Sequence, residues 1–204
     1  MFTDDQRFDT VRAHGCEEIV TPTMDELARR GTSFCRAHIM GSYQAAVCVA
    51  SRAMMLTGRS LWHAPQNIPP DAAVWPHLMR EHGYHTFCTG KWHNDVPAFT
   101  KSFAGGAKIF FGGMSNHLEV PVHDFDPSGK YPPEKRYIGK KFSSELFTDE
   151  AVDFITRYEE DAPFFLYLPY TAPHDPRMAP ERYEGMYPRD EIPVPENFLP
   201  EHPF

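Results

Sequence analysis

The residues with the clearest chemical potential are a cysteine and an arginine four positions apart, Cys48 and Arg52. They open a run of helix-forming residues that ends at Thr57-Gly58, where the glycine suits the left-handed position that closes a helix. A cysteine at a helix entrance faces unpaired backbone N–H groups and the positive end of the helix dipole, which favour an anion. The arginine lies one turn further on, so its guanidinium can bind the same tetrahedral oxyanion through two hydrogen bonds. The alternative is a buried cysteine at the start of a core helix, and the neighbouring motifs must decide.

Two adjacent carboxylates, Asp4 and Asp5, follow a short strand-like segment at the start of the sequence. Neighbouring carboxylates repel each other, so at the carboxyl end of a strand they indicate a shared cation. Ca²⁺ and Mg²⁺ prefer such oxygen ligands. A solvated acidic turn would have the same two residues, so this pair alone leaves both interpretations open.

Basic side chains follow two stretches of strand-forming residues. Lys91 and His93 come after residues 84–89, and His174 follows the continuous apolar run 163–168. Ligand-binding groups of open α/β sheets collect beyond the carboxyl ends of the strands, which is where these three side chains are expected. A surface loop with ordinary polar residues is the alternative for each segment taken alone.

The segments that must position these residues alternate between helix and strand. Caps, glycine stops and apolar stripes predict helices over residues 21–31, 48–58, 73–82 and 143–158, with Ser144 as the cap of the last. Runs rich in β-forming residues predict strands over residues 32–38, 84–89 and 163–168. This alternation indicates an α/β fold with a mostly parallel sheet between helices.

Three regions give weaker patterns. Residues 107–111, between two glycine pairs, are expected to form a hairpin-like segment or a loop. Residues 119–140 have no regular period and are expected to form a long surface insertion. Beyond Pro176 the sequence is interrupted by proline and predicts no regular element.

The composition argues against several classes of protein. The chain has 204 residues, 41% hydrophobic and 24% charged, which is ordinary for one globular domain. Its formal net charge of −8 argues against a nucleic-acid partner or an anionic membrane, since either needs a clustered basic face. No apolar run approaches the roughly 20 residues of a membrane span, and no signal peptide is visible at Met1. The cysteines show no CxxC or zinc spacing, and a disulfide among Cys16, Cys35 and Cys88 stays open.

Five blocks of sequence bring the candidate residues into one ordered pattern. They are Asp4-Asp5; Thr21-Pro22 with Asp25, Leu27-Ala28, Gly31 and Phe34; Cys48-x-Ala50-Ser51-Arg52 with Leu56-Thr57-Gly58-Arg59; Gly83-Tyr84 with Thr86 and Gly90-Lys91-Trp92-His93; and Ala172-Pro173-His174-x-Pro176. Each block is weak alone, whereas all five in this order are highly specific. The pattern resembles the type I sulfatase family, which implies an alkaline-phosphatase-like α/β fold.

The resemblance implies that Cys48 is converted after translation to formylglycine, whose hydrate is the nucleophile. The partner for this step would be a formylglycine-generating or sulfatase-maturating enzyme. The resemblance also implies that Asp4, Asp5 and residue 48 bind Ca²⁺ and that Arg52 holds the formylglycine hydrate. Ala50 stands where the commoner family pattern has proline, and the alanine form also occurs in bacterial members.

By the same resemblance, Lys91 contacts the sulfate, His93 is the base that releases it, and His174 is the acid that protonates the departing alcohol. Ser115 and His117 lie where many members have a further sulfate-contacting residue, so both are expected to bind substrate. The residue types suit this chemistry, because imidazoles exchange protons near neutral pH and fixed cations stabilise the charge on nonbridging oxygens.

The resemblance further implies a partial domain. The family's second pair of metal ligands and a second catalytic lysine come later in its pattern than Phe204. Residues 1–204 are therefore expected to be the amino-terminal part of a single sulfatase catalytic domain, truncated at both ends. The implied activity is hydrolysis of sulfate esters on a sulfated carbohydrate, and the implied location is the periplasm or the cell exterior.

Three alternatives stay open at the level of sequence. A phosphodiesterase or phosphonate hydrolase of the same superfamily shares the Cys-x-[Pro/Ala]-x-Arg nucleophile, and sulfate and phosphate are both tetrahedral. A truncated, non-catalytic relative would keep an anion pocket for sulfated glycans. A thiol hydrolase would use Cys48 together with one of the histidines.

Overall fold

The computed structural model describes residues 1–44, 47–195 and 198–201, which form two compact units. The first unit contains Met1–Gln6 and His38–Met178, and the second contains Arg7–Ala37 and Ala179–Phe204. All the candidate site residues belong to the first unit. The expected single catalytic domain over residues 1–204 stays a prediction.

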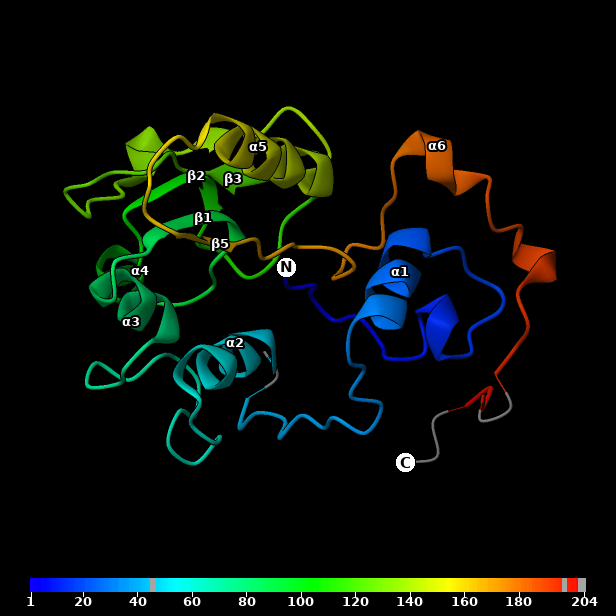
Figure 1. The fold of residues 1–204 in the computed structure, drawn as a ribbon. Helices are drawn as coiled ribbons and strands as arrows, with labels where there is room; N and C mark the ends of the chain where they lie inside the picture. Colours follow the sequence, from blue (N-terminus) through cyan, green and yellow to red (C-terminus); the bar gives the residue numbers. More distant parts are fainter. Residues whose placement is uncertain (45–46, 196–197, 202–204) are drawn as a thin grey trace. The chain divides into compact units, whose positions relative to one another are not determined.

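The first unit is built on a three-stranded parallel sheet in the order β2-β1-β5 (Figure 1). Its strands are β1 (His85–Lys91), β2 (Gly105–Phe110) and β5 (Phe164–Tyr167). Just beyond the end of β5, the N–H of Phe2 donates to the Leu168 carbonyl at 2.9 Å, which adds a short parallel bridge. The predicted parallel sheet is confirmed, as are its strands near residues 84–89 and 163–168.

Helices cover both faces of this sheet (Figure 1). One face packs against α5 (Ser143–Arg157). On the other side lie α2 (Val47–Thr57), α3 (Trp75–Glu81) and α4 (Val96–Ser102). The helices α2, α3 and α5 are confirmed predictions, whereas α4 was not predicted. The expected cap of α5 is wrong: the helix begins at Ser143, so Ser144 lies inside its first turn.

Each face of the sheet has its own apolar cluster. The cluster on the side of α2, α3 and α4 is dominated by large buried side chains, among them Trp92, Phe99, Phe103, Leu56 and Val74. The cluster under α5 contains Phe147, Leu146, Val120, Val122 and Phe110. A sheet covered on both faces is the usual environment of parallel strands. The parallel pairing of β1 with β5 brings their carboxyl ends to the same edge of the sheet.

Two loop predictions in the first unit are corrected. Residues 105–110 form the strand β2, which pairs in parallel with β1 and covers most of the segment 107–111 that was expected to be hairpin-like or a loop. Residue propensities do not predict this strand, because it begins with Gly105 and Gly106 and glycine is depleted in strands. The expected surface insertion 119–140 contains the antiparallel pair β3 (Pro121–Val122) and β4 (Tyr137–Ile138), and its Val120 and Val122 are fully buried.

The second unit contains α1 (Pro22–Arg30) and α6 (Glu181–Glu184), with short 3-10 turns at Arg12–His14 and Arg189–Glu191. The predicted helix over residues 21–31 is confirmed, and Gly31 ends it through a bond of 2.9 Å to the Leu27 carbonyl. The predicted strand over residues 32–38 is wrong. That segment is exposed throughout and pairs with no strand of the described residues, so its β-forming side chains have no sheet to join.

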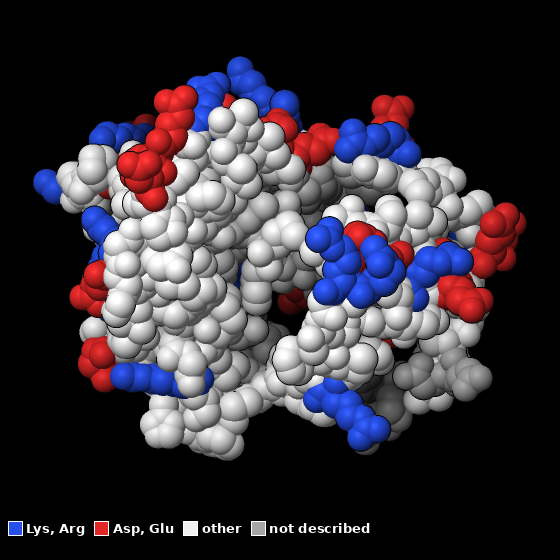
Figure 2. Space-filling model, viewed as in Figure 1, with Lys and Arg blue, Asp and Glu red and all other residues white. Residues whose placement is uncertain are grey.

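The described surface carries charges of both signs. On the face shown in Figure 2, lysine and arginine alternate in small groups with aspartate and glutamate instead of forming one continuous basic surface. The longest helix in the described part of the chain, α5, has 15 residues, and no described helix is both long and apolar enough to span a membrane. All four cysteines are free thiols, so the disulfide left open by the sequence is not formed.

Candidate active site

Cys48 lies in the first turn of α2, as the sequence predicts. The helix ends at Gly58, whose φ of +66° is the left-handed conformation expected there, and the Gly58 N–H donates to the Met54 carbonyl at 2.8 Å. The Cys48 side chain is almost completely buried, and its Sγ lies 3.3 Å from Nδ1 of His93. The thiol and the imidazole are therefore direct neighbours.

Arg52 is fully buried one turn further along α2. Its Nη1 donates to the backbone carbonyl of Lys91 at 2.6 Å, and its Nη2 donates to the carbonyl of Tyr170 at 3.3 Å. The same Nη2 lies 3.2 Å from a carboxylate oxygen of Asp4. The ring of Phe2 lies under the guanidinium, 4.9 Å from its central carbon. These contacts fix the guanidinium at the carboxyl ends of β1 and β5.

Lys91 is the last residue of β1 and is also fully buried. Its Nζ donates to the second carboxylate oxygen of Asp4, which is itself 2% exposed. Arg52, Lys91 and Asp4 thus form a buried group of two cations and one carboxylate. A buried excess of positive charge is costly unless an anion meets it, so this group favours an anionic ligand.

His93 lies two residues beyond β1, with a φ of +51°. Histidine tolerates this left-handed conformation better than most residues, and here it turns the ring toward Cys48. Burial lowers the pKa of His93 to about 4, and the nearby cations Lys91 and Arg52 act in the same direction. The imidazole is therefore unprotonated at neutral pH and able to accept a proton.

Gly113 was not predicted to belong to this site. A Cβ added at Gly113 would lie 2.6 Å from Nε2 of His93, so only glycine lets this loop approach the ring so closely. The Gly112-Gly113 pair was the available sequence signal, but it does not identify the partner.

His174 faces the acidic pair. Its Nε2 lies 3.4 Å from a carboxylate oxygen of Asp5, and its Nδ1 lies 2.9 Å from the carbonyl of Asp175. Since a carbonyl only accepts, Nδ1 carries a hydrogen, and Nε2 is the atom that exchanges a proton beside the Asp5 carboxylate. The side chain of His174 is 17% exposed, which leaves it reachable by a ligand.

The two further residues expected to bind substrate lie in different settings. His117 is 1% exposed, with Nδ1 at 2.7 Å from Ser143 Oγ and Nε2 at 3.0 Å from the carbonyl of His174. Both ring nitrogens therefore contact protein groups. The hydroxyl of Ser115 lies 3.4 Å from the carbonyl of Glu119. Substrate binding by Ser115 and His117 stays a prediction.

Comparison with known protein families identifies the chain. The family model described as Sulfatase matches residues 1–199. The chain belongs to the sulfatase family. The resemblance drawn from the five sequence blocks is thus confirmed at the level of the family.

Curated sulfatases are similar over nearly all of this chain. Arylsulfatase J of Mus musculus is 28% identical, over 92% of this chain and 34% of its own length. The N-acetylglucosamine-6-O-sulfatase of Bacteroides thetaiotaomicron is 26% identical, over 99% of this chain and 35% of its own length. The N-acetylgalactosamine-6-sulfatase of Homo sapiens is 28% identical, over 91% of this chain and 41% of its own length. The chain therefore spans between about a third and two fifths of the length of these sulfatases.

Solved structures confirm the alkaline-phosphatase-like fold. A protein in complex with its substrate D-glucosamine-2-N,6-O-disulfate superposes with a TM-score of 0.74 at 24% identity, over 96% of this chain and 38% of its own. Ps i-CgsB, solved with k-i-k-neocarrahexaose, superposes with a TM-score of 0.75 at 26% identity, over 94% and 48%. The described sheet and helices are thus part of a larger sulfatase fold.

The acidic pair fits calcium in the type of its ligands. Asp4 and Asp5 offer carboxylate oxygens, which Ca²⁺ prefers, but the two oxygens of Asp4 already pair with Arg52 and Lys91 and would have to be shared with the ion. No group of three or more His, Cys, Asp or Glu side chains that could hold a metal ion occurs among the described residues. The pair can therefore supply only part of the roughly 6–8 oxygen ligands that calcium takes.

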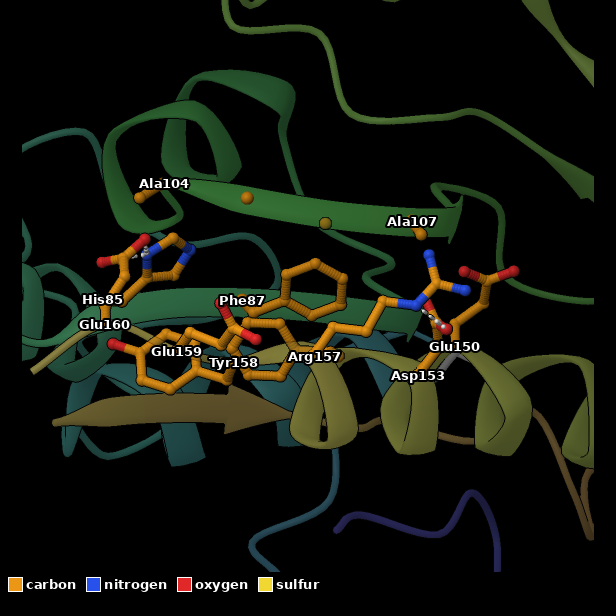
Figure 3. Close-up of a pocket in the computed structure, with 13 residues that line it drawn as sticks. His85, Phe87, Ala104, Ala107, Glu150, Asp153, Arg157, Tyr158, Glu159 and Glu160 are labelled. Carbon is orange, nitrogen blue, oxygen red and sulfur yellow. Dashed lines mark hydrogen bonds and ion pairs between the residues drawn. The ribbon is translucent and has the colours of Figure 1, made fainter. Parts of the chain in front are cut away.

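A cavity of about 560 Å³ opens at the other end of the sheet, between β1, β2 and α5 (Figure 3). His85 at the start of β1 lines it, roughly 20 Å from Lys91 at about 3.3 Å per strand residue. Its charged lining consists of four carboxylates and one guanidinium: Glu150, Asp153, Glu159, Glu160 and Arg157. This acidic surface would repel a sulfate ester, so the cavity is a poor candidate for the sulfatase site.

Proposed function

We propose that the complete protein hydrolyses sulfate esters of carbohydrates, with residue 48 as the nucleophile after its conversion to formylglycine. The observation that carries this proposal is the buried excess of positive charge beside Cys48, where Arg52 and Lys91 share the single carboxylate of Asp4 in a chain of the sulfatase family. A sulfate ester would supply the missing anion next to the nucleophile.

Each side chain has one task in this proposal. Arg52 and Lys91 bind and orient the nonbridging oxygens of the sulfate, where charge is stabilised electrostatically. His93 accepts a proton beside residue 48, and His174 donates one from Nε2 to the oxygen of the departing alcohol. A formylglycine hydrate at position 48 would supply one oxygen for attack on sulfur and a second whose deprotonation releases sulfate.

Calcium is the second group that the proposal includes. We infer that Asp4 and Asp5 hold it together with ligands outside the described residues, and that it would stabilise negative charge on the sulfate oxygens. Calcium should then raise the unfolding temperature of the protein, and Asp5→Asn should abolish that rise. Asp175→Asn, which changes an exposed carboxylate of the same unit, is the matched control. An equal calcium response in Asp5→Asn would contradict the assignment.

The substrate class rests on the relatives. Two of the curated relatives are named for 6-sulfated amino sugars, and both solved structures cited above contain a sugar ligand. We therefore infer a sulfated glycan as substrate, a sulfatase-maturating or formylglycine-generating enzyme as partner, and a periplasmic or extracellular location. The electrostatic argument against nucleic acid applies here too, given the net charge of −8.

A thiol hydrolase is the second candidate function, because the Cys48 thiol lies 3.3 Å from the His93 ring. The mass of the tryptic peptide 37–52 separates the two candidates. Conversion of cysteine to formylglycine replaces sulfur with oxygen and removes two hydrogens, whereas a thiol hydrolase keeps the unmodified mass and reacts with iodoacetamide.

Turnover of matched aryl esters tests the activity itself. The proposal predicts hydrolysis of an aryl sulfate in preference to the matching aryl phosphate diester, and loss of that activity in Cys48→Ala. A preference for the phosphate diester would instead support a phosphodiesterase. An unmodified Cys48, binding of a sulfated glycan and no turnover of either ester would support a non-catalytic binder.

A further inference from the structure

A buried polar chain lies directly behind the His174 backbone. Its three members are His117, Ser143 and Thr171, which are 1%, 0% and 4% exposed. Ser143 Oγ lies 2.7 Å from His117 Nδ1 and 2.7 Å from Thr171 Oγ1. The ring of His117 stacks on Phe142, with centroids 5.2 Å apart and planes at 16°. The proposed reaction uses none of these groups directly.

The hydrogen bonds of this chain run in one direction. Nε2 of His117 faces the carbonyl of His174 at 3.0 Å, and a carbonyl only accepts, so Nε2 carries the hydrogen. In the neutral ring Nδ1 then accepts from the Ser143 hydroxyl, and Ser143 Oγ in turn accepts from the Thr171 hydroxyl. Each buried hydroxyl therefore has a partner, and the ring is held in a single tautomer.

The same segment is anchored at two further points. The Asp4 N–H donates to the carbonyl of Ala172 at 3.1 Å, and the His174 N–H donates to the carbonyl of Thr171 at 3.1 Å. His117 is thus the side chain that ties the His174 backbone to the buried interior, while Asp4 ties the same segment to the acidic pair. A shift of this backbone would move the His174 ring away from Asp5.

We propose that His117 is a positioning residue, which acts through the His174 carbonyl to fix the His174 ring as the proton donor to the leaving alcohol. This inference rests on the proposed function, because it needs His174 to act as that donor. It assigns His117 a role in place of the direct sulfate contact expected from the resemblance. Ser143 and Thr171 hold the His117 ring in turn.

The test uses the dependence of rate on the leaving group. An unactivated sugar alcohol needs a proton as it departs, whereas 4-nitrophenolate leaves without one. The full-length protein is assayed on a monosaccharide sulfate and on 4-nitrophenyl sulfate. His117→Leu should lower kcat for the sugar sulfate by about 10- to 100-fold more than for the aryl sulfate. This is only part of the roughly 10²–10⁴-fold contribution of a general acid, because the His174 ring is displaced but still present.

His117→Gln is the conservative variant. Its amide nitrogen can still donate to the His174 carbonyl. The ratio of the two rates in this variant should therefore lie within about threefold of the ratio in the protein without substitutions. Ser143→Ala supplies a second measurement if His117→Leu does not fold, because it removes only the hydroxyl that bonds Nδ1. It should change the ratio in the same direction by a smaller factor.

The reference variant is His174→Ala, which should show the same selective loss as His117→Leu. A selective loss in His174→Ala together with equal losses on both esters in His117→Leu and Ser143→Ala would overturn the positioning role and leave the proposed function standing. If the protein without substitutions, carrying formylglycine at position 48, hydrolyses neither ester, the proposed function is overturned, and the positioning role with it.

Discussion

Arg52 both donates to two backbone carbonyls and forms an ion pair with Asp4, which the single ammonium group of a lysine could not do in the same geometry. Its planar guanidinium donates to the carbonyl that ends β1, at Lys91, and to the carbonyl of Tyr170 beyond β5. The same group pairs with Asp4, so one side chain joins three backbone segments one helical turn from Cys48. Lysine has the same charge but lacks the planar set of N–H donors of the guanidinium. Replacing Arg52 with lysine therefore tests the hydrogen bonds separately from the charge.

We expect Arg52→Lys to lower both stability and activity. At least one buried carbonyl loses its donor, which costs about 1–3 kcal/mol of the free energy of unfolding. Hydrolysis of 4-nitrophenyl sulfate should fall by at least about 100-fold, the scale of losing one oriented electrostatic contact. Urea unfolding and initial rates measure the two effects.

Arg59→Lys is the matched control for that change. Arg59 forms a solvent-exposed pair with Asp71, so the exchange should alter the free energy of unfolding by less than about 1 kcal/mol. Equal effects at positions 52 and 59 would contradict the role given to Arg52.

Under the proposed function, the acid limb of the activity should report on His93. Only the unprotonated ring accepts a proton, and burial together with Lys91 and Arg52 lowers its pKa from 6.5 to about 4. As the pH falls, kcat should therefore persist through 6.5 and decline with a midpoint near 4. Steady-state rates on an aryl sulfate measure this, with circular dichroism at each pH to follow the fold. A midpoint at or above 6.5 would contradict the assignment of His93 as base.

Gly113 gives a test of geometry without a change of charge. Gly113→Ala places a methyl group 2.6 Å from Nε2 of His93, so the ring must move relative to residue 48. We expect kcat to fall at least about tenfold, since small misplacements of catalytic groups are costly. Met114→Ala, at an exposed neighbour, is the control and should leave kcat near its original value. Unchanged rates in Gly113→Ala would show that the ring does not need this approach.

At the scale of elements, the site depends on two parallel strands that end together. Gly90 lets the end of β1 approach the backbone at Pro169, just beyond β5. Its φ is +123°, and an added Cβ would lie 2.0 Å from the carbonyl oxygen of Pro169. Through the same contact, the Lys91 N–H donates to Pro169 at 2.7 Å. The glycine therefore sets where the Lys91 side chain leaves the sheet.

Gly90→Ala should be among the most damaging single substitutions in the first unit. The new methyl group meets backbone and the φ is strained, so we expect a loss of more than about 3 kcal/mol in the free energy of unfolding. Urea denaturation measures this. Gly185→Ala is the control, because Gly185 has a φ of −87° and open space around it. A loss below about 1 kcal/mol in Gly90→Ala would contradict the packing described here.

The sequence predicts these elements where pattern and propensity agree. The helix α5 and the strand β5 have clear apolar patterns, and α2 has a glycine stop, so each was predicted close to its observed bounds. The strand β2 was missed because two glycines open it and only its pairing with β1 reveals it. Residues 32–38 show the converse, since β-forming side chains form no strand without a partner.

The site residues likewise divide into those that local sequence motifs predict and those that only the packed structure reveals. Ordered motifs predict Cys48, Arg52, Lys91 and His174 as a group, because each lies within or shortly after a predictable helix or strand. The approach of Gly113 to the His93 ring and the chain from Thr171 to His117 join segments distant in sequence. No local pattern encodes such contacts, and only the packed structure reveals them.

At the scale of the whole molecule, the two units differ in how much they bury. The helix α1 of the second unit has no buried residue, whereas five of the seven residues of β1 are buried. Amides of α1 should therefore exchange with deuterated solvent faster than those of β1, by at least about 100-fold. Hydrogen exchange of the 204-residue chain, read out by mass spectrometry, measures this. Equal protection of the two elements would contradict the difference in burial.

In the proposed reaction, the Arg52, Lys91 and Asp4 group has a consequence for the last step, the release of sulfate. The buried excess of positive charge attracts inorganic sulfate, the product that remains after the alcohol has left, as well as the sulfate ester. Free sulfate should therefore compete with the ester, slow turnover as it accumulates and protect the fold against heat. An enzyme with this arrangement would work best where its product is carried away.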